Sequence, residues 1–343
     1  GHQRMASNQV ASNPFDLRQW SNDPKVGHLA EALKTISPTD YSAIVPIPFF
    51  HIGSELLFVQ SHSSYKGVLE AFTLSYHSGL PLTASHLSRN SISESRKAIQ
   101  FFAPELLEKE IAEDITNEQP FLLLFSKTSF QPSEEELRLL TLGDLVYENN
   151  DIALYRMDQN AIWSTTASNY RSLYLSYQEL YLQEGPYQYF GDGWYQFDSF
   201  DAEVQPSSPF SGGALSYQGT APLTLLDTRM KDASFKGEME LSFWLKIEGD
   251  ITHAKLNQIR FQDGEAMNPE VLLNARKSFS IYKDWVRWQY YFDADPEAPI
   301  LIALEPPSIG KRVLIDELMV RPTNSSVYTL KETGWLWNNY PIQ

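Results

Sequence analysis

The first part of the chain alternates between stretches with the periodicity of a helix and short runs of apolar residues. The apolar runs predict buried strands at 41–47, 68–74 and 121–125. Two capping boxes predict the starts of helices, Ser91 with Glu94 and Ser133 with Glu136. Helices interleaved with apolar strands are typical of layered α/β folds. We therefore expect a small α/β layer domain over residues 13–157.

Residues 158–193 carry a stripe of tyrosines. Tyr170, Tyr174, Tyr177 and Tyr181 recur at spacings that place them along one side of a helix. An aromatic stripe of this kind is more often a packing face than a binding site. We expect a connecting helix that docks between two domains.

In the C-terminal part the pattern changes to a period of two. Between residues 239 and 247 every odd-numbered residue is apolar, and the even-numbered ones are polar except Trp244. This alternation is typical of a half-buried antiparallel strand. Further apolar or alternating strands are expected at 286–292, 300–304 and 313–320. Short strands with Gly, Pro and Asp in the turns predict a β-sandwich of jelly-roll type over residues 194–343.

The composition agrees with two folded domains and disfavours some kinds of binding partner. The chain has 343 residues, of which 42% are hydrophobic, so it can bury sizeable cores. Its 27 Lys and Arg against 43 Asp and Glu give a formal net charge of −16, which disfavours nucleic acid and anionic lipid surfaces. The sequence contains no cysteine, which excludes disulfides, thiolate metal sites and cysteine nucleophiles.

The start of the chain indicates a processed product or a piece of a longer protein. It begins Gly-His-Gln-Arg, and we expect residues 1–12 to be a tag or a disordered lead. No signal peptide is visible. Apolar runs such as 121–125 are far shorter than the roughly 20 residues of a membrane-spanning helix. Any catalytic part is expected to lie outside this chain.

Polar side chains gather after the first two predicted strands, at His51, Glu55, His77 and Arg89. In open α/β sheets, ligands collect outside the carboxyl ends of strands, and imidazole with carboxylate can bind zinc or transfer protons. The spacing matches no metal motif, and the sequence has no Gly-x-Ser-x-Gly elbow. The four residues form a candidate ligand site. The alternative is that the two histidines lie in loops and hydrogen-bond to backbone carbonyls, which is the commoner role of such residues.

Trp244 lies on the polar side of its predicted strand, where an aromatic ring can stack on the apolar face of a sugar. Arg287 and Tyr291 are expected on the same side of a neighbouring strand. The three residues form a second candidate ligand site. The alternative is that a loop or the tyrosine-rich helix covers Trp244, because a large aromatic side chain is usually buried.

Residues 13–157 resemble a known kind of membrane-protein region. The resemblance lies in Pro46-Ile47-Pro48-Phe49-Phe50-His51-Ile52-Gly53-Ser54-Glu55, Ser78-Gly79-Leu80-Pro81 and Leu87-Ser88-Arg89. These segments look like the soluble region that follows the last membrane span in some bacterial polytopic glycosyltransferases of the GT-C type. The resemblance implies an extracytoplasmic, periplasmic location. In that family the catalytic carboxylate lies in an early loop between membrane helices, so no catalytic residue is carried over.

Residues 194–322 are similar to the framework of jelly-roll carbohydrate-binding modules. The similarity rests on Phe197-Asp198-Ser199-Phe200-Asp201, Gly212-Gly213, Ser242-Phe243-Trp244-Leu245-Lys246 and Leu314-Ile315-Asp316-Glu317-Leu318. Such modules often hold a structural calcium ion between an acidic residue near the first strand and another in the last. Asp201 and Asp316 occupy comparable places, so the resemblance implies a structural calcium site there.

Together these observations predict a non-catalytic, extracytoplasmic region of a membrane glycosyltransferase-like protein. Its partners would be carbohydrate or lipid-linked sugar and the membrane-spanning part of the same protein. One alternative is a free-standing carbohydrate-active hydrolase or esterase that uses His51, Glu55 and His77. Another is a structural pair of domains that mediates protein contacts. We expect the isolated chain to show neither glycosyl transfer nor hydrolysis.

Overall fold

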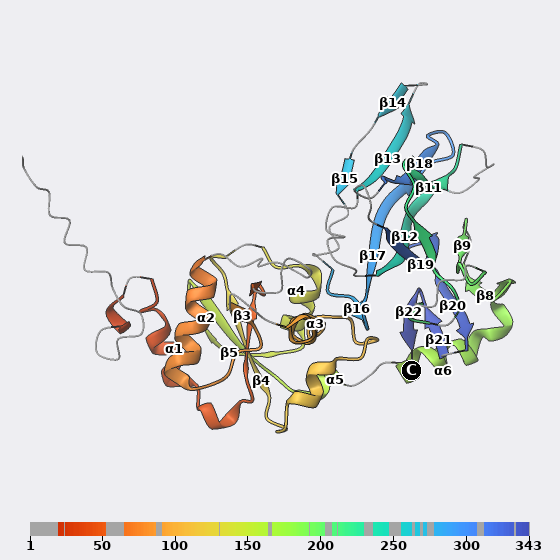
Figure 1. Ribbon diagram of the computed structural model, residues 1–343. Coiled ribbons are helices and arrows are strands. Elements are labelled where there is room, and N and C mark those ends of the chain that lie inside the picture. Colours follow the sequence, from red (N-terminus) through yellow and green to blue (C-terminus); the bar gives the residue numbers. More distant parts are fainter. Residues whose placement is uncertain are drawn as a thin grey trace, which may run out of the picture. The chain divides into compact units, whose positions relative to one another are not determined.

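The computed structural model divides the chain into two compact units (Figure 1). The described residues are 20–23, 25–52, 65–86, 91–129, 131–163, 167–191, 193–202, 208–210, 212–229, 236–246, 255–262, 265–267, 270–272, 278–306, 312–332 and 334–342. The α/β unit comprises the described residues of Gly1–Gly53, Gln60–Asn90 and Ile111–Trp163, and the sandwich unit those of Ser91–Glu110 and Ser164–Gln343. The fold class expected from the sequence, a small α/β layer domain with a β-sandwich, is confirmed.

The α/β unit is built on a four-stranded sheet in the order β1-β4-β6-β5. Its strands are β1 (Ile44–Ile47), β4 (Phe121–Ser126), β5 (Asp144–Glu148) and β6 (Ile152–Met157). β1 runs parallel to β4, and β6 is antiparallel to both of its neighbours. A separate parallel pair is formed by β2 (His51–Ile52) and β3 (Ser85–His86). The strands expected at 41–47 and 121–125 are confirmed.

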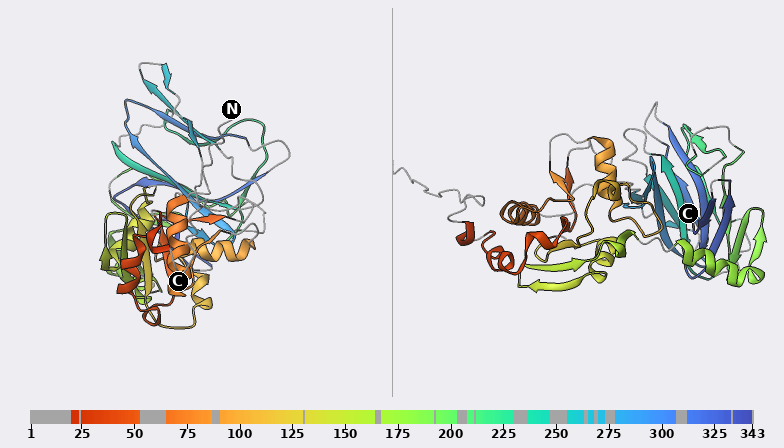
Figure 2. Two further views of the ribbon diagram at one scale, coloured as in Figure 1. Left: turned by 90° about the vertical axis from the view of Figure 1, so that its left-hand side faces the viewer. Right: turned by 90° about the horizontal axis from the view of Figure 1, so that it is seen from below.

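The helices of this unit pack against the sheet and against one another. They are η1 (Trp20–Asn22), α1 (Leu29–Thr35), η2 (Pro38–Asp40), α2 (Tyr65–Ser78), α4 (Glu134–Thr141) and α5 (Asn160–Trp163), and η3 (Glu110–Asp114) lies where the chain passes between the units. α2 contacts β1 and β4, and α1 contacts α2 (Figure 2). The predicted capping box of Ser133 and Glu136 is present at the start of α4.

The strand expected at 68–74 is wrong, because this segment is the middle of α2. The buried residues of α2 are Gly67, Glu70, Ala71, Thr73, Leu74 and Ser78. They recur at intervals of three and four, which is the period of one helix face. A short apolar run does not distinguish a buried strand from a buried helix, whereas the 14-residue length of α2 does.

The sandwich unit contains two sheets that enclose a core. The central sheet has the order β10-β19-β12-β17-β16, with β9 also paired to β19, and the distal sheet has the order β11-β18-β13-β14, with β15 also paired to β13. Central-sheet strands are β9 (Gln196–Asp198), β10 (Leu215–Tyr217), β12 (Gly237–Lys246), β16 (Ile281–Tyr282), β17 (Trp285–Ala294) and β19 (Val313–Pro322). Distal-sheet strands are β11 (Leu223–Asp227), β13 (Lys255–Gln262), β14 (Glu265–Met267), β15 (Glu270–Leu272) and β18 (Ile300–Leu304).

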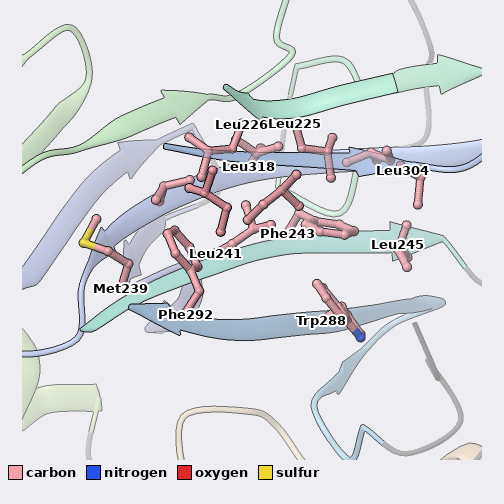
Figure 3. Packing of buried hydrophobic residues seen from close by; sticks show 14 of the residues in the cluster. Leu225, Leu226, Met239, Leu241, Phe243, Leu245, Trp288, Phe292, Leu304 and Leu318 are labelled. Atoms are coloured by element: carbon pink, nitrogen blue, oxygen red, sulfur yellow. The ribbon is translucent and has the colours of Figure 1, made fainter. Parts of the chain in front are cut away.

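The core between these sheets follows the predicted alternation. Met239, Leu241, Phe243 and Leu245 of β12 are all buried in it, together with Leu226 and Leu304 of the distal sheet (Figure 3). Burying such side chains contributes roughly 1.5–3 kcal/mol each, which fixes which face of β12 points inward. Because the side-chain period of a strand is two, the even-numbered residues of β12 point to the outer face of the central sheet.

A third sheet covers that outer face, and it was not expected from the sequence. This C-terminal sheet has the order β22-β21-β20-β8-β7. Its strands are β7 (Leu182–Glu184), β8 (Tyr187–Phe190), β20 (Ser326–Lys331), β21 (Gly334–Trp337) and β22 (Tyr340–Ile342). Leu336 of β21 packs with Trp244 and Leu314, and Val327 of β20 packs with Met319, so the two sheets share apolar clusters.

Helices complete the sandwich unit. α3 (Ile92–Gln100) begins at the predicted capping box of Ser91 and Glu94, and Gln100 Nε2 donates to Ile281 O at 3.3 Å. This segment lies in the sandwich unit, although the sequence places it within the first domain. Among the described residues, no helix in either unit is long and apolar enough to cross a membrane.

The tyrosine stripe lies partly on α6 (Ala167–Tyr177), which is followed by η4 (Gln178–Leu180). Tyr174 is buried against Tyr328, and Tyr170 and Tyr181 belong to the same cluster, so these three form a packing face on the C-terminal sheet. Tyr177 is 51% exposed and lies outside that face. The helix ends earlier than expected, because the chain continues into β7 and β8.

Candidate functional site

Trp244 does not form an exposed platform, which corrects the expectation for this residue. Its side chain is 0% exposed, and its indole Nε1 donates to Asn339 O at 2.9 Å. The reason is the turn between β21 and β22, which lies on the outer face of the central sheet. Asn338 and Asn339 form this turn with positive φ values of 47° and 66°. Asparagine tolerates that left-handed conformation, which two-residue hairpin turns require.

Arg287 lies beside Trp244 on the outer face and is also buried. Its Nη2 donates to Glu240 Oε1, and Arg321 Nη2 donates to Glu240 Oε2 at 2.7 Å. Burial opposes the ionisation of Glu240, but the two guanidinium groups outweigh it and hold the pKa of that carboxyl below its usual value. Arg287, Glu240 and Arg321 therefore form a buried ion triad, and Arg287 is not available to an incoming ligand.

Tyr291 is the residue of this candidate site that remains accessible. It is 46% exposed and stands across from Glu240 in the register of β12 and β17. Burial of the phenol, followed by the nearby Glu240, raises its pKa to about 12, so Tyr291 stays a neutral hydrogen-bond donor at neutral pH. Gln289, two residues earlier on the same face, is exposed as well.

The buried triad positions the side chains around Tyr291. Arg287 Nη1 donates to Gln289 Oε1 at 2.5 Å and to the Tyr340 hydroxyl at 3.3 Å. The guanidinium also lies over the Tyr340 ring, 4.2 Å from its centroid. We call Gln289, Tyr291 and Tyr340 the Tyr291 surface. It combines an exposed aromatic ring with an amide and a second phenol that are held by a buried arginine.

The predicted histidine cluster of the α/β unit is only partly described, because Glu55 and Arg89 lie outside the described residues. His51 is buried, its Nδ1 is 3.3 Å from Ser85 Oγ, and burial lowers its pKa. The ring of His77 stacks on Trp20 with centroids 4.2 Å apart. Each imidazole therefore has a neighbouring side chain of its own, but His51 lies in β2 and His77 in α2 rather than in loops. The candidate ligand site stays a prediction.

A different polar cluster lies at the carboxyl end of β4, and sequence reasoning missed it. Glu70 of α2 is completely buried; its Oε2 accepts from Ser126 Oγ at 2.6 Å and its Oε1 is 2.8 Å from His28 Nε2. Lys66 lies 3.8 Å from Glu70 and 2.6 Å from Asp151. Lys66 and Glu70 are four residues apart on α2, but the other members of the cluster are distant in sequence, so no spacing signal joins them all. The buried carboxylate ties α2 to β4 and to the start of α1.

The two acidic residues expected to bind calcium lie near a lysine. Lys331 Nζ is 2.8 Å from Asp201 Oδ2 and 2.5 Å from Glu317 Oε1. Asp316 Oδ2 accepts from Ser208 Oγ at 2.5 Å, and its Oδ1 accepts from Glu317 N at 2.8 Å. Among the described residues, no group of three or more His, Asp and Glu side chains has an arrangement that could hold a metal ion. These contacts do not test the calcium ion that the resemblance implies.

Burial changes the acidity of this cluster in a way that predicts a pH dependence. It raises the pKa of Asp316 to about 7 and that of Glu317 to about 8, although Lys331 opposes both shifts. Between pH 4.5 and 8 the folded chain therefore holds protons that the unfolded chain has released. Stability should be greatest at the acid end of this window and fall as pH rises through it, by about 1.4 kcal/mol per pKa unit.

Glu317→Gln is expected to flatten this dependence, because the amide does not titrate. The measurement is urea unfolding at several pH values between about 5 and 8.5. Glu240, whose pKa is lowered, changes its protonation only at pH values below this window and does not affect the slope within it. A free energy of unfolding with the same slope in wild type and Glu317→Gln would contradict the prediction.

Comparison with known proteins assigns no family. No protein-family model and no curated protein matches the chain. Among solved structures it is similar to the CBM22-1 xylan-binding domain from Paenibacillus barcinonensis Xyn10C, with 16% identity over 39% of this chain and 84% of that chain and a TM-score of 0.24. The xylan-binding module CBM15 is 8% identical, over 42% and 95% of the two chains, with a TM-score of 0.21.

A third similar structure contains a catalytic module as well. It is the CBM22-1-GH10 modules of the Clostridium thermocellum endo-1,4-β-D-xylanase 10B complexed with xylohexaose, with 11% identity over 40% of this chain and a TM-score of 0.23. The match spans only 26% of that protein's length. TM-scores of this size assign neither a family nor a ligand to the present chain.

Proposed function

We propose that the sandwich unit binds carbohydrate through the Tyr291 surface. The observation that carries the proposal is Tyr291, an aromatic ring 46% exposed on a sheet face. One face of a pyranose ring is lined by C–H groups and stacks on such a ring, while the sugar hydroxyls pair with amide and phenol groups. Gln289 and Tyr340 offer those groups beside Tyr291. The proposed sugar site lies on the same face of the sheet as the site expected from the sequence, but at Tyr291 instead of Trp244.

The fixed surroundings of Tyr291 also support the proposal. Gln289 and Tyr340 are held by Arg287, and Arg287 is held in turn by Glu240. Side chains that are already positioned lose less conformational entropy when a ligand binds. A surface that makes only a few contacts with its ligand therefore gains affinity when its side chains are already held in place.

Neighbouring charges favour an uncharged sugar. Glu238 and Asp293 are directly opposite each other in the register of β12 and β17, one row beyond Tyr291. Their negative charge, in a chain of net charge −16, repels carboxylates and phosphates. The preferred ligand would be a neutral glycan, or the neutral sugar residues of a lipid-linked donor.

The wider context is part of the same proposal. The chain would be the extracytoplasmic, periplasmic region of a membrane glycosyltransferase-like protein, and it would position glycan or lipid-linked sugar for the membrane-spanning part. Support comes from the resemblance of residues 13–157 to such regions. Several apolar segments of about 20 residues encoded upstream of this chain would agree with it, and a complete gene without them would contradict it.

Tyr291→Ala is expected to weaken glycan binding about fivefold or more. One stacked ring contributes about a kcal/mol or more, and the wild-type Kd should lie between about 10 μM and a few mM. A glycan array identifies the ligand, and isothermal titration or NMR titration then measures both affinities. The matched control is Tyr65→Ala, which removes an exposed tyrosine (76% exposed) from the α/β unit. Its affinity should equal that of the wild type.

Two outcomes would overturn this function. The first is an array without any bound glycan, and the second is a ligand that Tyr291→Ala binds as tightly as the wild type does. The hydrolase alternative is examined in the same preparation with aryl glycosides and aryl esters. Turnover that His51→Ala or His77→Ala removes would favour that alternative.

A further inference from the structure

The acidic cluster of the sandwich unit contains a positive charge supplied by the chain itself. Lys331, on β20, is 5% exposed and extends between Asp201 and Glu317. Its nitrogen lies within 2.8 Å of a carboxylate oxygen of each. An ammonium group donates up to three hydrogen bonds and carries one full charge. It can therefore satisfy acidic side chains in the way a bound metal ion does.

We propose that the ammonium group of Lys331 is the resident cation of this cluster, in the place where the resemblance to carbohydrate-binding modules implies calcium.

The oxygen atoms of the cluster fit an ammonium better than a calcium ion. Calcium takes six to eight oxygen ligands at about 2.3–2.6 Å. Both carboxylate oxygens of Asp316 already accept hydrogen bonds from protein donors, Ser208 Oγ and Glu317 N. One oxygen each of Asp201 and Glu317 contacts Lys331. A calcium ion would have to displace a cation that is covalently part of the chain and pays no entropy of association.

The backbone also positions the acidic residues around the lysine. Gly212 has a φ of +77°, and a Cβ atom there would lie 2.1 Å from Asp201 Oδ1, so glycine is needed for Asp201 to approach this turn. Glu317 has a φ of +51°, at the point where the pairing of β12 with β19 shifts register. β19 is buried along its whole length, and Asp316 and Glu317 are both completely buried.

The ion pairs of Lys331 also join separate parts of the sandwich unit. Its ammonium group contacts Asp201, in the loop after β9, and Glu317 of β19. The lysine thus stabilises the junction of β19, β20 and the loop after β9 without a metal.

The test compares melting temperatures with calcium and with a chelator. Wild-type protein should shift by less than about 1 °C between about 5 mM CaCl₂ and about 5 mM EDTA, because no ion is bound or released. Lys331→Ala should melt about 5–10 °C lower, since buried carboxyl groups lose their partner. In Lys331→Ala, calcium should restore at least about half of that loss, because the ion can then take the place of the missing ammonium group.

Controls keep the proposal falsifiable if Lys331→Ala folds poorly. Lys331→Arg retains the charge and should melt close to the wild type, and Lys236→Ala removes an exposed lysine (78% exposed) of the same unit and should melt within about 1 °C of it. A wild-type melting temperature that falls in EDTA, or calcium found in the purified protein by elemental analysis, would overturn the proposal. So would a Lys331→Ala variant as stable as the wild type.

Discussion

Trp244→Ala should lower the free energy of unfolding of the sandwich unit by about 3–5 kcal/mol. The indole is completely buried among Phe210, Leu314 and Leu336, so its removal leaves a cavity between the central and C-terminal sheets. The variant also removes the donor that pairs with Asn339 O, and an unpaired buried carbonyl adds about 1 kcal/mol or more. Urea unfolding followed by circular dichroism measures the difference.

Two further variants separate the parts of this effect. Trp244→Phe retains most of the apolar volume but not the N–H donor, and should cost about 1–2 kcal/mol. Tyr291→Ala, on the same face but exposed, should cost less than about 1 kcal/mol. If Trp244→Ala unfolded within about 1 kcal/mol of the wild type, Trp244 would be the exposed residue that the strand pattern alone suggests.

The comparison of Trp244 with its neighbours on β12 shows what a strand pattern can predict. Alternation correctly assigned Met239, Leu241 and Phe243 to the core, because burial of large apolar side chains fixes the inward face. The same alternation assigned Glu240, Ser242 and Trp244 to the other face, which is also correct. What it could not show is that this second face is covered too.

The covering layer did leave a signal in the sequence. Asn338-Asn339 is flanked by Trp337 and Tyr340, and asparagine pairs between aromatic residues favour a two-residue hairpin. A jelly-roll needs only two sheets, so residues 194–343 were expected to form two sheets and not a third. The pairing of β20 with β8, which are separated by more than a hundred residues, has no local signature at all.

The polar networks were unpredictable for a related reason. Glu240, Arg287 and Arg321 lie on three different strands, and only the register of β12 with β17 and β19 brings them together. Glu70 and Ser126 likewise meet only through the packing of α2 on β4. Each of these charged residues, taken alone in the sequence, looks like an ordinary surface side chain.

Features that depend only on residues close together in the sequence were predicted correctly. The capping boxes at Ser91 and Ser133 were predicted correctly, because cap and partner are only three residues apart. The segment 68–74 failed because a short apolar run has no such local marker. The boundary expected within residues 158–193 stays a prediction, although α6 groups with the sandwich unit.

Glu240→Ala should be among the most destabilising single substitutions in the sandwich unit, with a loss of about 3–5 kcal/mol. It leaves the guanidinium groups of Arg287 and Arg321 buried without their shared carboxylate. Arginine does not lose its proton in proteins, so the two positive charges persist and repel each other at a site that water screens poorly. Denaturant unfolding at low and high salt tests this, and the loss should change little with salt.

A triple variant shows whether the cost arises from unpaired charge. Glu240→Met, Arg287→Met and Arg321→Met together remove all three charges while keeping apolar volume, and should cost less than Glu240→Ala alone. Because Arg287 holds Gln289 and Tyr340, the triple variant should nevertheless bind glycan more weakly. Stability close to that of Glu240→Ala would mean that the triad contributes packing and hydrogen bonds that methionine cannot replace. Wild-type affinity in the triple variant would mean that Tyr291 binds sugar without the support of Arg287.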